Sequence, residues 1–210
     1  MNRSPGKEIT IIDYGAGNLR SVANATIKLG YQPVVTSDPD KVTAARIVIL
    51  PGVGAAGDTV SSLRKLGMET VIHRLVEEKR PLLAICVGLQ VLLSETEEGG
   101  LHPCFGIVPG RVRKLPEGQK VPHMGWNQVE QRFPHPIFEG IPDEANFYFA
   151  HSYYADPSDS SVVAGTTDCG TAICSVLAKD NLVATQFHPE KSGDYGLRVY
   201  DNFLRLAERS

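Results

Sequence analysis

The first half of the chain alternates short apolar runs with segments of helical periodicity, and this alternation constrains the fold more than any other feature. The apolar, largely β-branched runs that predict strands occupy residues 8–12, 33–36, 46–50 and 82–85. Helical spacing of apolar residues marks the segments 19–29, 71–76 and 88–95. Because strands that alternate with helices build a parallel sheet covered on both faces, we expect an α/β fold.

Residues 105–154 are rich in Gly and Pro and contain only short strand-like pieces. No linker-like stretch or charge run separates them from the rest, so we expect antiparallel strands added to the same sheet and not a second domain. Further strand candidates follow at 162–165, 172–177 and 182–186, and an amphipathic helix closes the chain. We therefore predict a single domain over residues 1–210, with an ordered core at about 8–208.

Charge and cysteine content argue against several classes of protein. Lys and Arg total 21 against 24 Asp and Glu, a formal net charge of −3, which argues against a nucleic-acid partner. The longest apolar run, Leu82–Leu93, is interrupted by Gly88 and Gln90 and is too short to span a membrane, and the N-terminus shows no secretory signal. Four cysteines without a C-x-x-C pair predict free thiols in the cytoplasm, with neither a disulfide scaffold nor a metal site.

The strongest local signal is Cys86, which stands between an apolar strand and a helix. The run Leu82–Ile85 leads directly into it, and Gly88 follows within the next helical turn. A sharp strand-to-helix turn of this kind presents a nucleophile at the carboxyl end of a sheet, and the amide of Val87 would point at an oxyanion. From these residues alone, a cysteine buried in the core is as good an interpretation as a nucleophile.

A cysteine nucleophile needs a base, and His188 is the best placed of the six histidines. Pro189 favours an extended backbone at His188, so the Glu190 carboxylate can lie beside the imidazole. This is the arrangement of a base and its orienting carboxylate in a Cys-His-Glu triad. Surface positions are expected for His73, His102 and His135, whereas His123 and His151 stay possible bases.

Two glycine-rich loops follow strands in the first half. Gly15-Ala16-Gly17 lacks the third glycine of a dinucleotide-binding fingerprint, so we interpret it as a tight turn before a helix capped by Asn18. Pro51-Gly-Val-Gly54 would lie beside the cysteine turn, where its free amides could bind an oxyanion. A simple strand-to-helix turn is the alternative for this loop.

The motifs P-G-V-G, A-I-C-V-G-L-Q and F-H-P-E-K-S occur together in this order, and in this the chain resembles the class I (triad) glutamine amidotransferases. The segments 13–19 (D-Y-G-A-G-N-L), 121–127 (V-P-H-M-G-W-N) and 147–153 (F-Y-F-A-H-S-Y) are similar to the glutaminase subunits of imidazole glycerol phosphate synthase. The resemblance covers nearly the whole chain. It implies a flavodoxin-like fold with a mostly parallel central sheet, helices on both faces and added antiparallel strands.

The resemblance also implies a role for each matching position. Cys86 would attack the side-chain amide of L-glutamine, His188 would carry the protons and Glu190 would orient His188. The oxyanion hole would be formed at Gly52, Val53 and Val87. The residues that hold glutamine would be Gln90, Glu98, Ser152 and Tyr153. Positions near the interface with a partner would be Asn18, Trp126, Tyr148 and Lys191.

The partner that the resemblance implies is a separate cyclase subunit with a (β/α)8 barrel, joined to this chain as a heterodimer. Ammonia would pass to that subunit for the synthesis of imidazole glycerol phosphate and AICAR in histidine biosynthesis, and no cofactor is implied. Two alternatives stay open, a glutaminase subunit of another synthase such as pyridoxal phosphate synthase, and a non-catalytic flavodoxin-like binding module. The chain departs from the family pattern at Ala84, where glycine is usual, and in the less regular stretch 101–106.

Overall fold

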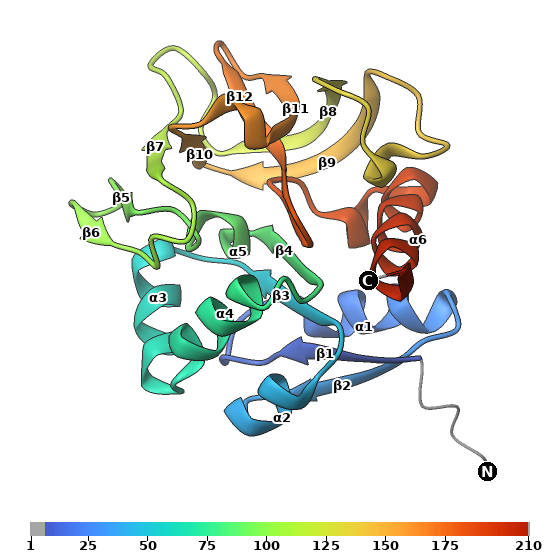
Figure 1. Ribbon diagram of the computed structural model, residues 1–210. Helices are drawn as coiled ribbons and strands as arrows, with labels where there is room; N and C mark the ends of the chain where they lie inside the picture. The colour runs from blue at the N-terminus through green and yellow to red at the C-terminus, as the bar shows by residue number, and fades with distance from the viewer. Residues whose placement is uncertain (1–6, 210) are drawn as a thin grey trace.

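A nine-stranded mixed sheet forms the centre of the computed structural model, which describes residues 7–209 (Figure 1). Along the sheet the strands are β2 (Gln32–Thr36), β1 (Glu8–Ile12), β3 (Val48–Gly52), β4 (Leu82–Cys86), β13 (Leu182–Thr185), β12 (Ala172–Lys179), β11 (Val163–Asp168), β8 (His123–Gln131) and β9 (Ala145–His151). A smaller sheet consists of β10 (Tyr153–Pro157), β7 (Gly110–Lys114), β5 (Glu95–Thr96) and β6 (His102–Pro103). The expected α/β fold is confirmed.

The strands from β2 to β13 pair in parallel, and those from β13 to β9 pair antiparallel. The antiparallel strands therefore extend the same sheet, as expected. β3, β4 and β13 are neighbours that end at nearly the same level, because Gly52 pairs with Cys86 and Ile85 pairs with Thr185. The loops that follow these three strands consequently meet at one edge of the sheet, where open α/β sheets bind their ligands.

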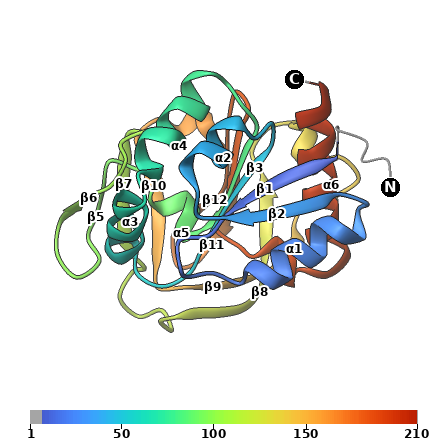
Figure 2. The ribbon, with the colours of Figure 1, turned by 90° about the horizontal axis from the view of Figure 1, so that it is seen from below.

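Helices cover both faces of the parallel part of the sheet (Figure 2). On one face α1 (Leu19–Lys28) packs beside α6 (Gly193–Arg209), and on the other lie α2 (Pro39–Ala44), α3 (Ala56–Lys65) and α4 (Met68–Glu77). α5 (Val87–Gln90) follows β4 directly, and short 3-10 turns occur at η1 (Pro136–Phe138), η2 (Ser160–Val162) and η3 (Pro189–Lys191). No helix within residues 7–209 combines the length and the apolar character needed to cross a membrane.

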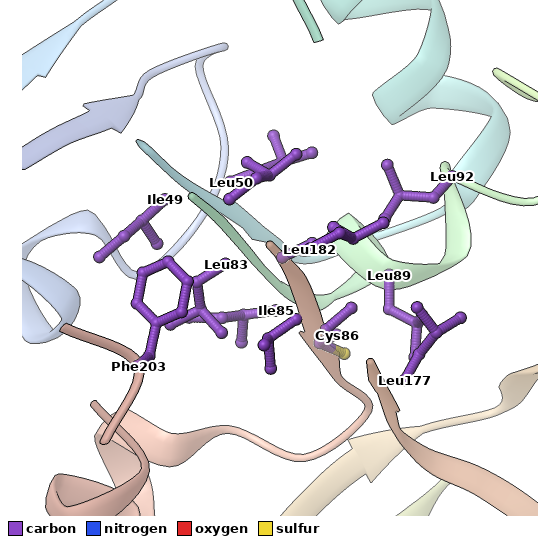
Figure 3. Close-up of a cluster of buried hydrophobic side chains, with 14 of the residues drawn as sticks. Ile49, Leu50, Leu83, Ile85, Cys86, Leu89, Leu92, Leu177, Leu182 and Phe203 are labelled. Carbon is purple, nitrogen blue, oxygen red and sulfur yellow. The ribbon is translucent and has the colours of Figure 1, made fainter. Parts of the chain in front are cut away.

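Buried apolar side chains pack around β3, β4 and β13, the strands whose loops meet at one edge of the sheet (Figure 3). Every residue of β3 and β4 is buried, as expected for strands covered on both faces. Leu83 and Ile85 of β4 share one face of the sheet and lie toward Phe203 of α6. Ala84 is fully buried with Leu50 and Ala184 as its strand partners, so the methyl group at this position is part of the core.

One local prediction is wrong, and another is confirmed only in part. The helix after Cys86 ends at Gln90 and not near residue 95, because the amides of Phe105, Gly106 and Val108 bond to the carbonyls at positions 91–93 that a longer helix would use. Asn18 occupies the N-cap position of α1, as expected, but its side chain makes no capping hydrogen bond. Its backbone ψ of 57° differs from the extended value at which a capping side chain reaches the first helical amides.

Candidate active site

Cys86 lies at the turn where β4 ends and α5 begins. Its backbone angles, φ 54° and ψ −108°, fall in a region that residues other than glycine rarely adopt. Such strain at a strand-to-helix turn is typical of a nucleophile elbow. The side chain is 2% exposed and lines a cavity of about 310 Å³. The structure thus contains the sharp turn that the sequence predicts.

Two glycines allow the loop after β3 to approach this turn at backbone contact. A Cβ atom at Gly88 would overlap the carbonyl oxygen of Leu50. A Cβ atom at Gly52 would overlap the backbone of Val87 and Gly88. Because neither position has room for a side chain, the loop that begins at Gly52 lies directly against the cysteine turn.

His188 lies between β13 and η3, with its ring beside Glu190. The Nδ1 atom of His188 is 2.9 Å from Oε1 of Glu190, and both side chains are almost fully buried. The backbone of His188 is fixed on both sides, since its N–H donates to the Tyr148 carbonyl at 2.9 Å and its carbonyl accepts from the Ser192 hydroxyl at 2.7 Å. This arrangement leaves Nε2 as the ring nitrogen available to Cys86.

The protonation of His188 depends on its two neighbours. Burial lowers the pKa of His188, but hydrogen bonds to Cys86 and Glu190, together with the charges of these groups, raise the pKa to about 9. The imidazolium is therefore the stable form near neutral pH. A buried imidazolium between a thiol and a carboxylate can deliver a proton to a leaving group.

The cavity brings together most of the predicted site residues. It is lined by Cys86 and His188 and also by Val53, Val87, Gln90, Glu98, Ser152, Tyr153 and Lys191. Gly52 and Glu190 are the sequence neighbours of cavity residues. Three predicted interface residues, Asn18, Trp126 and Tyr148, are not part of the cavity wall.

Comparisons with known proteins agree with this geometry. A family model described as glutamine amidotransferase class-I matches residues 10–206. The imidazole glycerol phosphate synthase subunit HisH of Dehalococcoides mccartyi (strain CBDB1) is 57% identical over 199 residues, which cover 95% of this chain and 97% of that protein. The HisH subunit of Chloroflexus aurantiacus is 51% identical and covers 95% of this chain and 96% of its own length. The chain belongs to the class I glutamine amidotransferases.

Within this family, it groups with the HisH subunits. Solved structures with lower identity share the fold. The structure of PurLQS from Thermotoga maritima superposes with a TM-score of 0.76 at 17% identity, covering 95% of this chain and 98% of that one. A glutamine amidotransferase from the same organism gives a TM-score of 0.65 at 16% identity, covering 93% of this chain and 80% of that one.

In this glutamine amidotransferase, two polar side chains of the cavity are held by protein contacts. Gln90 Nε2 donates to the Tyr153 carbonyl at 2.8 Å and to Oε1 of Gln186 at 3.2 Å. Oε2 of Glu98 accepts from the Ala56 amide at 2.8 Å, at the start of α3. Both side chains are therefore fixed in the wall by their own hydrogen bonds.

Gln186 is a site residue that the sequence analysis missed. It is fully buried, and its Nε2 atom donates to the Cys86 sulfur at 3.6 Å. Gln186 stands two residues before His188, and residues so spaced in an extended segment share a face. That spacing is the signal in the sequence that could have identified it.

The other two candidate bases, His123 and His151, are directed toward each other and not toward Cys86. His151 Nδ1 donates to the Tyr153 carbonyl at 3.0 Å, and its Nε2 lies 3.1 Å from Nδ1 of His123. Burial lowers the pKa of His151 to about 4, so its ring is neutral near pH 7. His188 is the histidine whose hydrogen bonding involves Cys86.

An exposed surface with aromatic side chains borders the cavity on β8 and β9. Trp126 is 57% exposed and packs edge to face on Tyr148, with ring centroids 6.1 Å apart. Lys191 Nζ lies 5.8 Å from the centre of the Tyr148 ring. Met124, which the sequence analysis missed, is 64% exposed and also lines the cavity. We call these four residues the β8–β9 surface.

Proposed function

We propose that this chain is the glutaminase subunit of an imidazole glycerol phosphate synthase and hydrolyses L-glutamine to glutamate and ammonia. The observation that carries the proposal is that Cys86 and His188 line one cavity, with Glu190 hydrogen-bonded to His188 behind it, in a chain of the HisH group. The volume of about 310 Å³ is at the lower end of the range for small-molecule pockets, as a free amino acid requires.

The residues divide the reaction into two steps. In the reacting form the proton of the Cys86 thiol resides on His188. The Cys86 thiolate attacks the side-chain carbonyl carbon of glutamine, and His188 gives this proton to the departing nitrogen, which leaves as ammonia. The product is a γ-glutamyl thioester on Cys86. His188, now neutral, takes a proton from water, whose oxygen attacks the thioester and releases glutamate and the thiolate. Glu190 keeps the His188 ring in orientation throughout.

The negative charge on the carbonyl oxygen needs backbone donors, and the loops after β3 and β4 carry the two candidate amides. Val87 N–H belongs to the first turn after Cys86, and Val53 lines the same cavity. The Val53 amide, however, donates to the Tyr14 hydroxyl at 3.3 Å and is not free for an oxyanion. One missing donor costs about 10²–10³ in turnover, so this orientation would keep the resting rate low.

The residues around the cavity divide into those that bind the substrate and those that contact the partner. Gln90, Glu98, Ser152 and Tyr153 hold the substrate, and the β8–β9 surface together with Asn18 faces the cyclase subunit in a heterodimer. That partner receives ammonia for the synthesis of imidazole glycerol phosphate and AICAR, in the cytoplasm. We propose that residues 1–210 form a single glutamine amidotransferase domain.

The decisive experiment measures glutamate and ammonia for three samples: the chain alone, the chain with the cyclase subunit, and both with an analogue of the cyclase substrate. A rate that rises at each step supports a glutaminase gated by its partner. Equal rates in the three samples would exclude the gated oxyanion hole. If no sample hydrolyses glutamine, the glutaminase proposal fails. Activation by a pyridoxal phosphate synthase and not by the cyclase would assign the chain to the alternative synthase.

A further inference from the structure

Three potential metal ligands from distant parts of the chain meet next to the cavity. His123 begins β8, His151 ends β9, and Cys169 lies in the turn between β11 and β12. One ligand atom from each residue lies within 4.8 Å of the other two. The proposed glutaminase reaction uses none of these side chains.

The distances between these atoms resemble those around a tetrahedral ion. Nδ1 of His123 is 3.1 Å from Nε2 of His151 and 3.5 Å from the Cys169 sulfur. With Zn–N bonds of about 2.0–2.1 Å and Zn–S bonds of about 2.3 Å, tetrahedral geometry separates two nitrogens by about 3.3 Å and a nitrogen and a sulfur by about 3.6 Å. The metal-free arrangement is therefore within a few tenths of an ångström of that geometry at two of its three edges.

The backbone and nearby polar groups hold the ligands in this position. His123 and His151 are direct partners in the β8–β9 ladder. The His151 Nδ1–H donates to the Tyr153 carbonyl, so the lone pair of Nε2 is directed at the cluster. Cys169 is fixed by its amide, which donates to the Thr171 carbonyl at 2.9 Å. The contact of His151 with the Tyr153 carbonyl is of the kind that metal-ligating histidines usually make through their second ring nitrogen.

The geometry points to a binding site for a divalent transition-metal ion of the zinc class, formed by His123 Nδ1, His151 Nε2 and the Cys169 sulfur. Two imidazoles and one thiolate suit Zn²⁺ and Co²⁺ and exclude Mg²⁺ and Ca²⁺, which prefer oxygen ligands. His123 is partly exposed, so water can complete the fourth position. The sequence analysis predicted no metal site because the three ligands show no local spacing motif.

Metal binding changes the protonation of Cys169 and His123. The Cys169 thiol loses its proton to solvent when sulfur bonds to the ion. The proton that His123 Nδ1 shares with His151 Nε2 in the metal-free protein moves to His123 Nε2. Because His151 Nδ1 and Gln90 Nε2 donate to the same Tyr153 carbonyl, the ion is linked to the wall of the glutamine cavity.

The test uses the full chain, reduced, with Co²⁺ as the spectroscopic probe and Zn²⁺ as its competitor. A Cys86→Ala background removes the cavity thiol, so that any sulfur-to-cobalt charge-transfer band comes from another cysteine. We expect one Co²⁺ per chain, a charge-transfer band in the near ultraviolet, and loss of the band when Zn²⁺ is added.

The ligand assignment is checked by added substitutions. Cys169→Ser should remove the band, whereas Cys104→Ser, at another buried free thiol, should keep it. His123→Gln should weaken Co²⁺ binding at least tenfold. Circular dichroism shows whether Cys169→Ser folds, and if it does not, His123→Gln tests the site in its place. Any of three results would overturn the site. The first is the absence of a charge-transfer band in the Cys86→Ala background, and the second is a band that survives Cys169→Ser. The third is an unchanged affinity for Co²⁺ in His123→Gln.

Discussion

The backbone amide of Val53 donates its hydrogen to the hydroxyl of Tyr14 across 3.3 Å. The same hydroxyl hydrogen-bonds to the Thr59 side chain, and burial raises the pKa of Tyr14, so the phenol stays neutral. One hydrogen bond therefore holds a proposed oxyanion donor in an orientation in which it cannot serve a substrate.

We predict that Tyr14→Phe raises the glutaminase rate of the isolated chain by about fivefold. Removal of the hydroxyl removes a restraint worth about 1 kcal/mol on the orientation of the Val53 peptide. Ammonia release by the chain without its partner measures the effect. Tyr31→Phe is the matched control, because that hydroxyl bonds to Glu208 far from the cavity. An unchanged or lower rate in Tyr14→Phe would show that Tyr14 does not restrain the loop.

The triad variants should differ in severity. Cys86→Ala should abolish glutamine hydrolysis while leaving the fold and partner binding intact, and the complex should still use added ammonium salts. Glu190→Gln should lower turnover less than His188→Ala, because an orienting group contributes less than the proton carrier. Steady-state rates with the cyclase present measure both effects. Residual activity of Cys86→Ala within tenfold of the parent would contradict the role of its sulfur.

The raised pKa of His188 makes stability depend on pH. Its value is about 9 in the folded protein against 6.5 for an unperturbed histidine, so the charged ring stabilises the fold fully below pH 6.5. The free energy of unfolding therefore falls as pH rises toward 9, by up to about 1.4 kcal/mol per pH unit. Urea unfolding of the parent and of His188→Gln between pH 6 and 10 measures it. A difference between the two proteins that stays constant over this range would contradict the raised pKa.

Gly88→Ala should destabilise the protein by about 3 kcal/mol and sharply lower its activity. The added Cβ would overlap the Leu50 carbonyl, and a backbone atom cannot move aside as a flexible side chain can. Gly57→Ala is the matched control, since a Cβ there meets only ring atoms of His102 at 3.8 Å, inside a helix that favours alanine. Unfolding free energies from urea titrations compare the two. Equal stability of both variants would show that the contact between the β3 loop and the turn is not tight.

Trp126→Ala should weaken binding to the cyclase subunit by at least tenfold. Exposed tryptophans in the middle of an interface commonly carry a large share of the binding energy. Leu101→Ala provides the control, because Leu101 is 62% exposed but lies next to β6, away from the β8–β9 surface. Calorimetric titration with the purified partner gives both affinities. If the two substitutions weaken binding equally, the β8–β9 surface is not the partner interface.

The sequence predicted those features that depend on neighbouring residues. The turn at Cys86 follows from an apolar strand that leads into a helix, and the contact between His188 and Glu190 follows from two positions in one extended segment. Features that depend on distant segments were missed. α5 is short because the chain at 105–108 takes its next carbonyls, and Gln186 reaches Cys86 only because β13 lies beside β4. Likewise, nothing near Cys169 in the sequence indicates His123 and His151.

The position of β13 has a consequence for how the protein is made. β4 is complete at residue 86, but its parallel neighbour on one side is not synthesised until residues 182–185. While the ribosome adds the intervening 95 residues, one edge of β4 has no strand beside it, and Cys86 has neither His188 nor Gln186 as a neighbour. A chain truncated before residue 182 can therefore carry the cysteine but not its base. Catalytic competence is therefore acquired only after His188 has been added to the chain.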